Sequence, residues 1–235
     1  MHMRNAASTA LLTKVLAGPL AAVVTDRAQL EQIFRFLTRD NDQFFLTWAM
    51  CAAKAAARAM EGIPGCTVVS TMARNGVEFG IRLAGLGDRW FTGPASVVAG
   101  SYFPGFTAAD ANRDVGDSAI METYGLGGMA MAASPAVTRI VGARSVADAV
   151  ETSRRMGEIC VGRNAAFPIG ALDWEGTPTG IDIRKVVETG IVPVINTAIA
   201  HRDVGVARII GAGMSTPPLE PFTDALVAFG EAYRV

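Results

Sequence analysis

The sequence at 66–91 reads CTVVSTMARNGVEFGIRLAGLGDRWF, and this stretch decides how the region around it folds. Apolar and polar residues alternate on both sides of Asn75-Gly76, a dipeptide that favours the type I′ turn of a two-residue β-hairpin. The pairs expected across this hairpin are Arg74 with Val77, Ala73 with Glu78, Thr71 with Gly80, and Val69 with Arg82.

The two faces of this hairpin differ in chemistry because side chains alternate along a strand. One face is expected to pack in the core and carries Val68, Ser70, Met72, Val77, Phe79, Ile81 and Leu83. The other face places Glu78 and Arg82 about 13 Å apart along one strand, at about 3.3 Å per residue. Thr71 and Gly80 form a small floor between the two charges. This face is either a seat for a small polar ligand or an ordinary half-exposed sheet surface, and the residues leave both interpretations open.

The composition is typical of a globular protein with much buried surface, including subunit interfaces. Of the 235 residues, 50% are hydrophobic and 18% are charged, and the net charge is −1. Since the chain has no basic tract, neither nucleic acid nor an anionic membrane is an expected partner. We expect a small-molecule substrate and an oligomer.

Metal and disulfide chemistry are not favoured. The chain has three well-separated cysteines, Cys51, Cys66 and Cys160, and only two histidines. This pattern predicts reduced thiols in the cytoplasm, with no disulfide framework and no zinc site. Asp110, Asn112 and Asp114 begin like a calcium loop, but the glycine and the final acid of that motif are missing. We therefore predict no bound metal and no cofactor.

Two apolar stretches superficially resemble membrane or export segments. Residues 1–24 mimic a secretory signal, but Lys14 interrupts the apolar part. Residues 123–138 are uncharged but contain three glycines and a proline, and they fall short of the ~20 residues of a spanning helix. The sequence therefore predicts no membrane segment.

Hydrophobic periodicity and capping residues predict helices first and strands later. Helices are expected at 6–24, with a kink or break at Pro19, and at 26–38. A long helix is expected to follow the capping residues 40–43 and to end at about Met60, and further helices are expected at 118–133, at 145–159, from about 181, and at 219–233. Strands are expected within 90–103, at 165–172, at 191–200 and at 206–210, with a turn at 176–180. This order favours an α+β fold (an α/β complex), in which helical segments precede a mixed β-sheet with packed helices. We expect a helical segment at 1–61 and one continuous body at 62–235.

The segment 125–130 matches G-x-G-x-x-A, the fingerprint of dinucleotide sites. No buried strand precedes it, and no acidic residue follows at the required distance. Close helix packing explains these glycines better. The chain also has no P-loop and no G-x-S-x-G motif.

His201 follows an apolar strand, where ligand sites often gather in α/β sheets. Its ordinary pKa suits acid–base catalysis, but a structural histidine fits equally well. Asn196 lies on the same strand. Upstream, Asp182 is expected to cap a helix, whereas Lys185 is available to bind an anion.

Several long motifs occur in a characteristic order: MARNGVEFGIRLAGLGDRWF at 72–91, YFPGF at 102–106, DANRDVGDSAIMETYGLGG at 110–128, and LDWEGTPTGIDIRKVVETGIVPVINTAIAH at 172–201. In these motifs the chain resembles the AllG family, also called YlbE/YahG-like and formerly a family of unknown function. The resemblance extends over essentially the whole chain. Family members are about twice as long, so the chain resembles their C-terminal part, and the family's N-terminal Rossmann-like portion is expected to be absent.

The resemblance implies a subunit of oxamate carbamoyltransferase in allantoin degradation, a branch of purine catabolism. That enzyme converts oxalurate and phosphate to oxamate and carbamoyl phosphate. The implied partners are an FdrA-like subunit and a third, smaller subunit. Two alternatives stay open: a non-catalytic assembly subunit of an FdrA-like complex, and an acyl-CoA-dependent transferase.

Carbamoyl transfer passes through an oxyanion and uses anionic substrates, so cationic clamps, amide donors and a proton carrier are needed. The expected proton carriers are Glu78, Asp88, Glu122 and His201. The expected substrate-binding residues are Arg4, Asn5, Thr71, Arg74, Asn75, Arg82, Lys185 and Asn196. Thr71, Arg74, Glu78 and Arg82 are expected to form one wall of the pocket.

Overall fold

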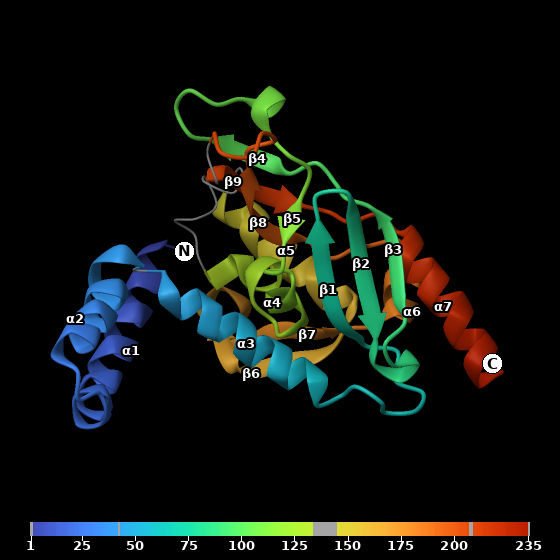
Figure 1. Cartoon of the computed structure of the whole chain (residues 1–235). Coiled ribbons are helices and arrows are strands. Elements are labelled where there is room, and N and C mark those ends of the chain that lie inside the picture. The colour runs from blue at the N-terminus through green and yellow to red at the C-terminus, as the bar shows by residue number, and fades with distance from the viewer. Residues whose placement is uncertain (1, 42, 134–144, 207–208, 235) are drawn as a thin grey trace. The chain divides into compact units, whose positions relative to one another are not determined.

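The computed structural model describes residues 2–41, 43–133, 145–206 and 209–234 (Figure 1). The chain forms two compact units, Met1–Ala52 and Ala53–Val235. The helix α3 (Phe44–Arg58) runs from the first unit into the second.

The first unit is entirely helical in its described part. It contains α1 (His2–Val23), α2 (Arg27–Arg35), the π-helical turn η1 (Phe36–Asp40) and the start of α3. Asp26 caps α2, since its side chain accepts hydrogen bonds from the N–H groups of Ala28 and Gln29. Pro19 lies inside α1 without ending it, so the helix continues where a kink or break was expected.

By length and composition alone, one described helix would be able to cross a membrane. This is the 19-residue stretch Asn5–Val23 of α1, of which 6% is buried. Signal sequences near an N-terminus and core helices of soluble proteins meet the same criterion. The expectation of no membrane segment therefore stays a prediction.

The strands of the second unit form three antiparallel sheets in the described residues. A four-stranded sheet has the order β3-β2-β1-β5, a three-stranded sheet the order β4-β9-β8, and β6 pairs with β7. The strands are β1 (Val69–Asn75), β2 (Glu78–Leu83), β3 (Trp90–Pro94), β4 (Ala99–Tyr102), β5 (Val115–Gly116), β6 (Cys160–Ile169), β7 (Glu175–Ile181), β8 (Ile195–Ala200) and β9 (Ile209–Ser215).

Helices are inserted between these strands. They are α4 (Ile120–Thr123), α5 (Val146–Glu158), α6 (Ile183–Thr189) and α7 (Glu220–Tyr233), with the short 3₁₀ turns η2 (Ala84–Leu86), η3 (Ala108–Asp110), η4 (Gly127–Ala133) and η5 (Gly170–Leu172). Helices combined with separate antiparallel sheets confirm the predicted α+β class.

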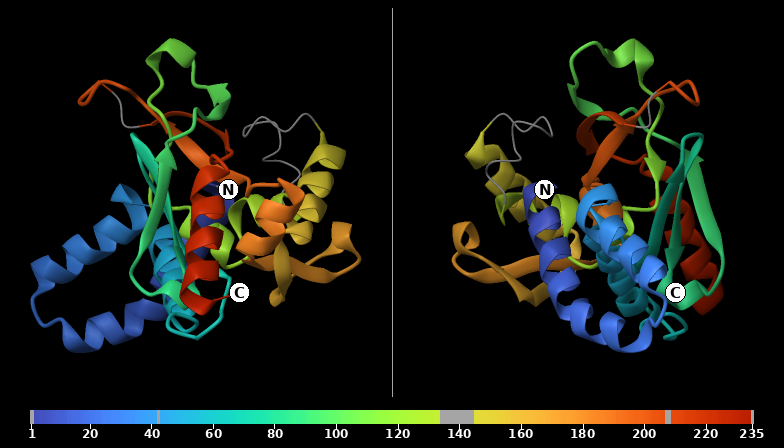
Figure 2. Two further views of the ribbon diagram at one scale, coloured as in Figure 1. Left: turned by 90° about the vertical axis from the view of Figure 1, so that its right-hand side faces the viewer. Right: turned by 60° about the vertical axis from the view of Figure 1, so that its left-hand side comes forward.

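The main core lies between the four-stranded sheet and α7, which runs alongside the strands in both views of Figure 2. Phe79 of β2 stacks on Phe222 of α7, with ring centroids 6.0 Å apart. Met72, Ile81 and Ile183 belong to the same buried cluster, so the sheet, α6 and α7 share one core. Within the second unit, the inner face of the hairpin is therefore fixed by apolar packing.

The hairpin forms where it was predicted, but its register differs by two residues. Arg74 pairs with Phe79 instead of Val77, and Thr71 pairs with Arg82 instead of Gly80. Gly76 and Val77 therefore form the two-residue loop. Of these two residues only Gly76 has a positive φ, 85°. The Asn75 side chain accepts hydrogen bonds from the N–H groups of Val77 and Glu78, at 2.9 and 2.6 Å, and this places Asn75 before the loop.

Two further expectations about local structure were wrong. Residues 176–180 were expected to form a turn, but they belong to β7, where the backbone of Asn164 lies so close to Gly176 that only glycine fits. Residues 118–133 were expected to form one helix, but two short helices flank a loop at 124–126. Gly125 and Gly127 in and beside this loop have positive φ values of 87° and 58°, which break a helix.

Candidate functional site

The hairpin buries a charged residue on its inner face. Arg74 of β1 is 5% exposed, and its Nε lies 2.9 Å from Oδ2 of Asp114, which is 2% exposed. Its Nη1 donates to the carbonyl oxygen of Gly116 at 3.0 Å. Its Nη2 donates to the hydroxyl oxygens of Thr197 at 2.7 Å and of Ser118 at 3.3 Å. The Arg74 guanidinium therefore joins β1, the loop before β5, the segment before α4, and β8.

Thr197 completes this network from the other side. Its hydroxyl donates to Oδ1 of Asp114 at 3.1 Å while it accepts from Arg74. The side chain of Thr197 is 7% exposed, so Arg74, Asp114 and Thr197 form a buried triad of one cation, one anion and one hydroxyl. A buried ion pair persists only where such additional hydrogen bonds offset desolvation.

Glu122 lies next to this triad and is completely buried. Its Oε1 accepts hydrogen bonds from the backbone N–H of Gly128 at 2.9 Å and from that of Asn196 at 3.0 Å. Its Oε2 has no hydrogen-bond partner among the described residues. Burial raises the pKa of Glu122 to about 7, against the opposing effects of the two N–H groups and of the charge on Arg74. At neutral pH this carboxyl group is poised between its acid and its base form.

The glycines after Glu122 make room for its carboxyl group. A Cβ on Gly127 would overlap Oε1 of Glu122, and a Cβ on Gly128 would overlap the carbonyl oxygen of Val194. The G-x-G-x-x-A match at 125–130 is thus explained by close packing of η4 against Glu122 and the segment leading into β8.

Replacing Gly127 with Ala is expected to destabilise the protein severely, by more than the ~1 kcal/mol of a strained φ alone. Gly87 has a similar φ of 62° but nothing within 4 Å of an added Cβ, so Gly87→Ala is the matched control. Urea denaturation of both variants measures the difference. Equal midpoints would show that Glu122 does not constrain Gly127.

The outer face of the hairpin carries a second charged cluster. Lys54 Nζ donates to Thr71 Oγ1 at 2.6 Å and to Glu61 Oε1 at 2.9 Å. Arg82 lies 3.9 Å from Glu61 Oε2 and also forms an ion pair with Asp88. Burial alone would raise the pKa of Glu61, but Lys54, Arg82 and Arg58 outweigh it and hold that pKa below its ordinary value.

The expected single pocket wall is therefore divided between the two faces of the sheet. Thr71 and Arg82 belong to the outer cluster, whereas Arg74 points into the core. Glu78 is exposed, and its Oε1 accepts a hydrogen bond from the Thr92 hydroxyl at 3.4 Å. The parity of the strand explains this division, because Arg74 is an odd number of residues from Thr71.

Other predicted residues already have internal partners. Lys185 Nζ donates to the carbonyl oxygen of Cys160 at 2.5 Å, so its charged group is bound to the first residue of β6. His201 Nδ1 accepts from the N–H of Asp203 at 2.9 Å, and its ring meets Phe106 edge-on at 5.9 Å. Among the described residues, neither side chain forms a hydrogen bond with Arg74, Asp114 or Thr197.

In the first unit, the side chain of Arg4 lies outside the described residues, although its backbone belongs to α1. Asn5 is buried, and its amide donates to the Gln43 carbonyl oxygen at 3.1 Å and to Gln43 Oε1 at 2.9 Å.

Three of the predicted residues therefore come together: Arg74, Glu122 and Asn196, the last through its backbone N–H. The sequence reasoning missed Ser118 and Thr197, and it considered Asp114 only as a calcium ligand. A polar Thr197 inside an apolar strand was a usable signal for a buried partner. Within the described ranges, no group of three His, Cys, Asp or Glu side chains is placed to hold a metal ion.

The family model of "Oxamate carbamoyltransferase subunit AllG" matches residues 1–118. The whole chain is also 47% identical over 234 residues to the oxamate carbamoyltransferase subunit AllG of Escherichia coli K12. The chain belongs to the AllG family. An uncharacterised protein of the same organism, YahG, is 47% identical over 235 residues.

A crystal structure of a conserved protein of unknown function from Enterococcus faecalis V583 has the same fold as this AllG-family chain. The TM-score is 0.88 at 46% sequence identity, and the match covers 98% of this chain and 54% of that one. The match covers 55% of the E. coli AllG subunit and 49% of YahG, so the chain spans about half the length of the curated relatives it matches.

Proposed function

We propose that this chain is a subunit of a carbamoyltransferase complex that phosphorolyses oxalurate to oxamate and carbamoyl phosphate. The proposal is supported by 47% identity over 234 residues to the E. coli protein called oxamate carbamoyltransferase subunit AllG. The observation that supports a mechanism is the burial of the Glu122 carboxyl group near the charge of Arg74. FdrA-like and smaller third subunits are the proposed partners, phosphate is the co-substrate, and the cytoplasm is the proposed location.

The reaction needs a group that carries one proton. An oxygen of hydrogen phosphate forms a bond to the carbamoyl carbon, and the bond from that carbon to the amide nitrogen of oxamate breaks. The phosphate proton finally resides on that nitrogen. A carboxyl group with a pKa near 7 is matched to such a transfer, because it gives and takes a proton at similar cost.

Among the four predicted proton carriers, Glu122 fits this role best. Glu78 is exposed, the Asp88 side chain is 97% exposed, and Nδ1 of His201 is already engaged with Asp203. Glu122 has an Oε2 without a hydrogen-bond partner in the described part of the chain, and the nearby cation of Arg74 favours the negative charge that develops in the reaction. Since Glu122 is enclosed, our proposal requires η4 to move aside when substrate binds.

Glu122→Gln is expected to lower the phosphorolysis rate of the reconstituted complex roughly 100-fold or more. The Gln side chain can still accept hydrogen bonds from the same two backbone N–H groups, but it cannot release or take up a proton near neutral pH. Carbamoyl phosphate formation by the complex is the measurement. Glu78→Gln, on an exposed strand position, is the matched control and should leave the rate unchanged.

The second candidate function is a non-catalytic assembly subunit, and a specific observation favours it. Arg74, Arg82 and Lys185 all use their cations on internal partners, so none of these three is a free clamp for an anion. Near-normal rates in Glu122→Gln, together with activity of the FdrA-like subunit assayed alone, would establish this alternative. Binding of coenzyme A to the complex would instead favour an acyl-CoA-dependent transferase.

A further inference from the structure

A short segment of η4 closes over the carboxyl group of Glu122. The N–H of Gly128 donates to Glu122 Oε1 at 2.9 Å, and a Cβ added to Gly127 would overlap the same oxygen. Residues 127–130 therefore lie directly against the carboxyl group. In this closed arrangement Glu122 is completely buried, and its Oε2 has no hydrogen-bond partner in the described part of the chain.

Hydrogen bonds fix the chain on both sides of residues 127–130. Before this segment, the N–H of Leu126 donates to the carbonyl oxygen of Met121 at 3.0 Å. After it, the N–H of Ala132 donates to Ser153 Oγ of α5 at 3.0 Å. The segment between these two points is therefore the part of η4 that can move without releasing either attachment.

Residues 127–130 also have a joint at each end. Gly127 has a positive φ of 58°, which suits glycine, and Ala130 interrupts the helical turns of η4 with a φ of −105° and a ψ of 23°. Hinges in proteins consist of a few residues of this kind, which absorb changes in backbone angles. The one large side chain of the segment, Met129, is fully buried, so opening has a cost and the open form is a minor state.

We propose that residues 127–130 form a lid, which is closed over Glu122 while its carboxyl group is protonated and opens when that group ionises. A carboxylate enclosed with one oxygen unpaired is unfavourable, because the charge loses its water and gains no donor at that oxygen. Opening the lid returns water to Oε2. The protonated acid carries no charge, so its enclosure costs less.

The charged side chains around Glu122 are already paired. Arg74 of β1 forms an ion pair with the buried Asp114, and Glu175 of β7 forms one with Arg163. The sequences of η4 and β8 contain no charged residue, and the buried residues of α5, which packs against η4, are Ala149, Ser153 and Met156. On these described elements, no cation is therefore free to neutralise the Glu122 carboxylate while the lid is closed.

The use of the open state rests on the proposed function. In that state Glu122 is a carboxylate, which can accept the proton of hydrogen phosphate and pass it to the oxamate nitrogen. Substrate reaches Glu122 only while the lid is open, so the lid admits substrate to the ionised form of this group.

Opening of the lid should become more favourable as the pH rises from about 4.5 to about 7. Burial raises the pKa of Glu122 to about 7 in the closed state, whereas a hydrated Glu122 has its ordinary pKa of 4.5. Below pH 4.5 both states hold the proton, and above pH 7 both have lost it, so the opening equilibrium changes only between these values. The population of the open state should rise roughly 20-fold from about pH 5 to about pH 6.5.

Amide hydrogen exchange of the full chain, followed by NMR, tests this lid. The N–H of Gly128 is bound to Glu122 and should lose roughly 20-fold of its protection over this pH range, after correction for the intrinsic pH dependence of exchange. In Glu122→Gln, which does not titrate, the protection of Gly128 should stay constant. The N–H of Ile81 in β2, a strand paired on both sides, reports unfolding of the second unit and should exchange more slowly than that of Gly128.

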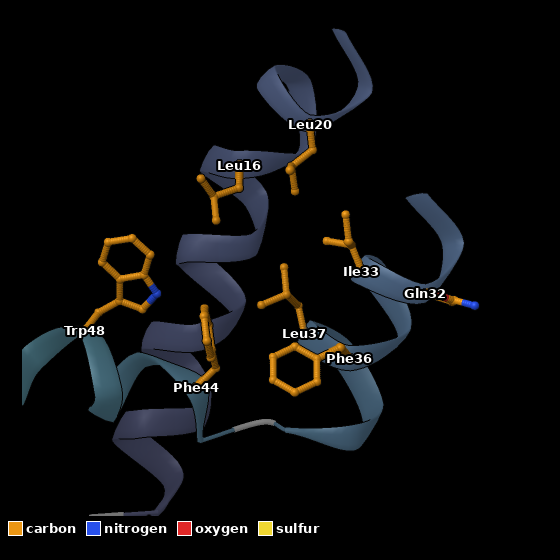
Figure 3. Close-up of a pocket in the computed structure, with 8 residues that line it drawn as sticks. All are labelled: Leu16, Leu20, Gln32, Ile33, Phe36, Leu37, Phe44 and Trp48. Carbon is orange, nitrogen blue, oxygen red and sulfur yellow. The ribbon is translucent and has the colours of Figure 1, made fainter. Parts of the chain in front are cut away.

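The first unit supplies a control region. Its apolar groove of about 370 Å³ is lined by eight residues, none of which is ionisable, and Leu37 is one of them (Figure 3). The protection of the Leu37 N–H should therefore not change over the same pH range in either protein. The comparison of Gly128 with Leu37 within the parent protein needs no variant, so it decides the matter even where Glu122→Gln folds poorly.

Two results would overturn the lid. One is a Gly128 protection that stays constant over this pH range in the parent protein. The other is equal exchange of Gly128 and Ile81 at every pH, which would mean that Glu122 becomes accessible only when the unit unfolds. Failure of the proposed function has a different signature: pH-dependent protection of Gly128 with a normal phosphorolysis rate in Glu122→Gln would keep the lid and remove Glu122 as the proton carrier.

Discussion

The free energy of unfolding of the parent protein is expected to fall between about pH 4.5 and pH 7, and Glu122→Gln is expected to remove this fall. The ordinary pKa of Glu122 is 4.5, and burial raises it to about 7 in the folded state. Below pH 4.5 both the folded and the unfolded chain hold the proton, so the group has no effect. Between these values the folded chain keeps a proton that the unfolded chain has released, and the free energy of unfolding falls as the pH rises.

This difference amounts to about 3 kcal/mol above pH 7, at about 1.4 kcal/mol per pKa unit. Gln does not titrate, so the variant should show no such slope, and its stability relative to the parent should rise from pH 4.5 to pH 7. Urea denaturation at several pH values measures this. Parallel pH profiles of the two proteins would mean that Glu122 is ionised throughout.

Glu61→Gln is the matched control because the pKa of Glu61 is shifted in the opposite direction. Its neighbouring cations hold it below 4.5, so it contributes stability above pH 4.5 that is lost as the pH falls. The two variants should therefore alter different parts of the same pH profile.

Arg74→Ala is expected to destabilise the protein by about 3–5 kcal/mol, because it leaves the buried Asp114 carboxylate without its cation. Arg74→Met combined with Asp114→Leu should recover much of this loss, since removing both charges also removes the cost of burying them. Denaturant midpoints and far-UV circular dichroism would measure the effect.

Arg82→Ala is the control for this prediction. Arg82 belongs to the same hairpin, but it pairs on the outer face with the exposed Asp88 and, at 3.9 Å, with Glu61, and neither carboxylate is fully buried. Its loss should cost about 1 kcal/mol, less than the loss of Arg74, because no fully buried carboxylate loses its cation. Similar losses for Arg74→Ala and Arg82→Ala would contradict the buried triad.

Local signals in the sequence located several of the elements, failed at 118–133 and 176–180, and were insufficient for the site. The alternation on both sides of Asn75 and Gly76 located β1 and β2, and the apolar stripes located α2 and α7. The exact register depended on whether Asn75 enters the loop, which its side-chain hydrogen bonds to Val77 and Glu78 decide.

The candidate site depended on contacts over long stretches of chain. Arg74 and Thr197 are 123 positions apart, and no pattern within either strand indicates that they meet. Glu122 was among the expected proton carriers, but its burial follows from the glycines of η4 and the edge of β8. The sequence therefore predicted the chemical types present in the site better than their partners.

The 123-residue separation of Arg74 and Thr197 also orders events during synthesis. The hairpin with Arg74 leaves the ribosome long before β8 exists, so its guanidinium has no hydroxyl partner from that strand during this interval. A nascent chain that ends before Ile195 lacks both Thr197 and the Asn196 N–H that holds Glu122. We expect the inner face of the early hairpin to stay hydrated until β8 is made, so that the second unit closes as a whole late in translation.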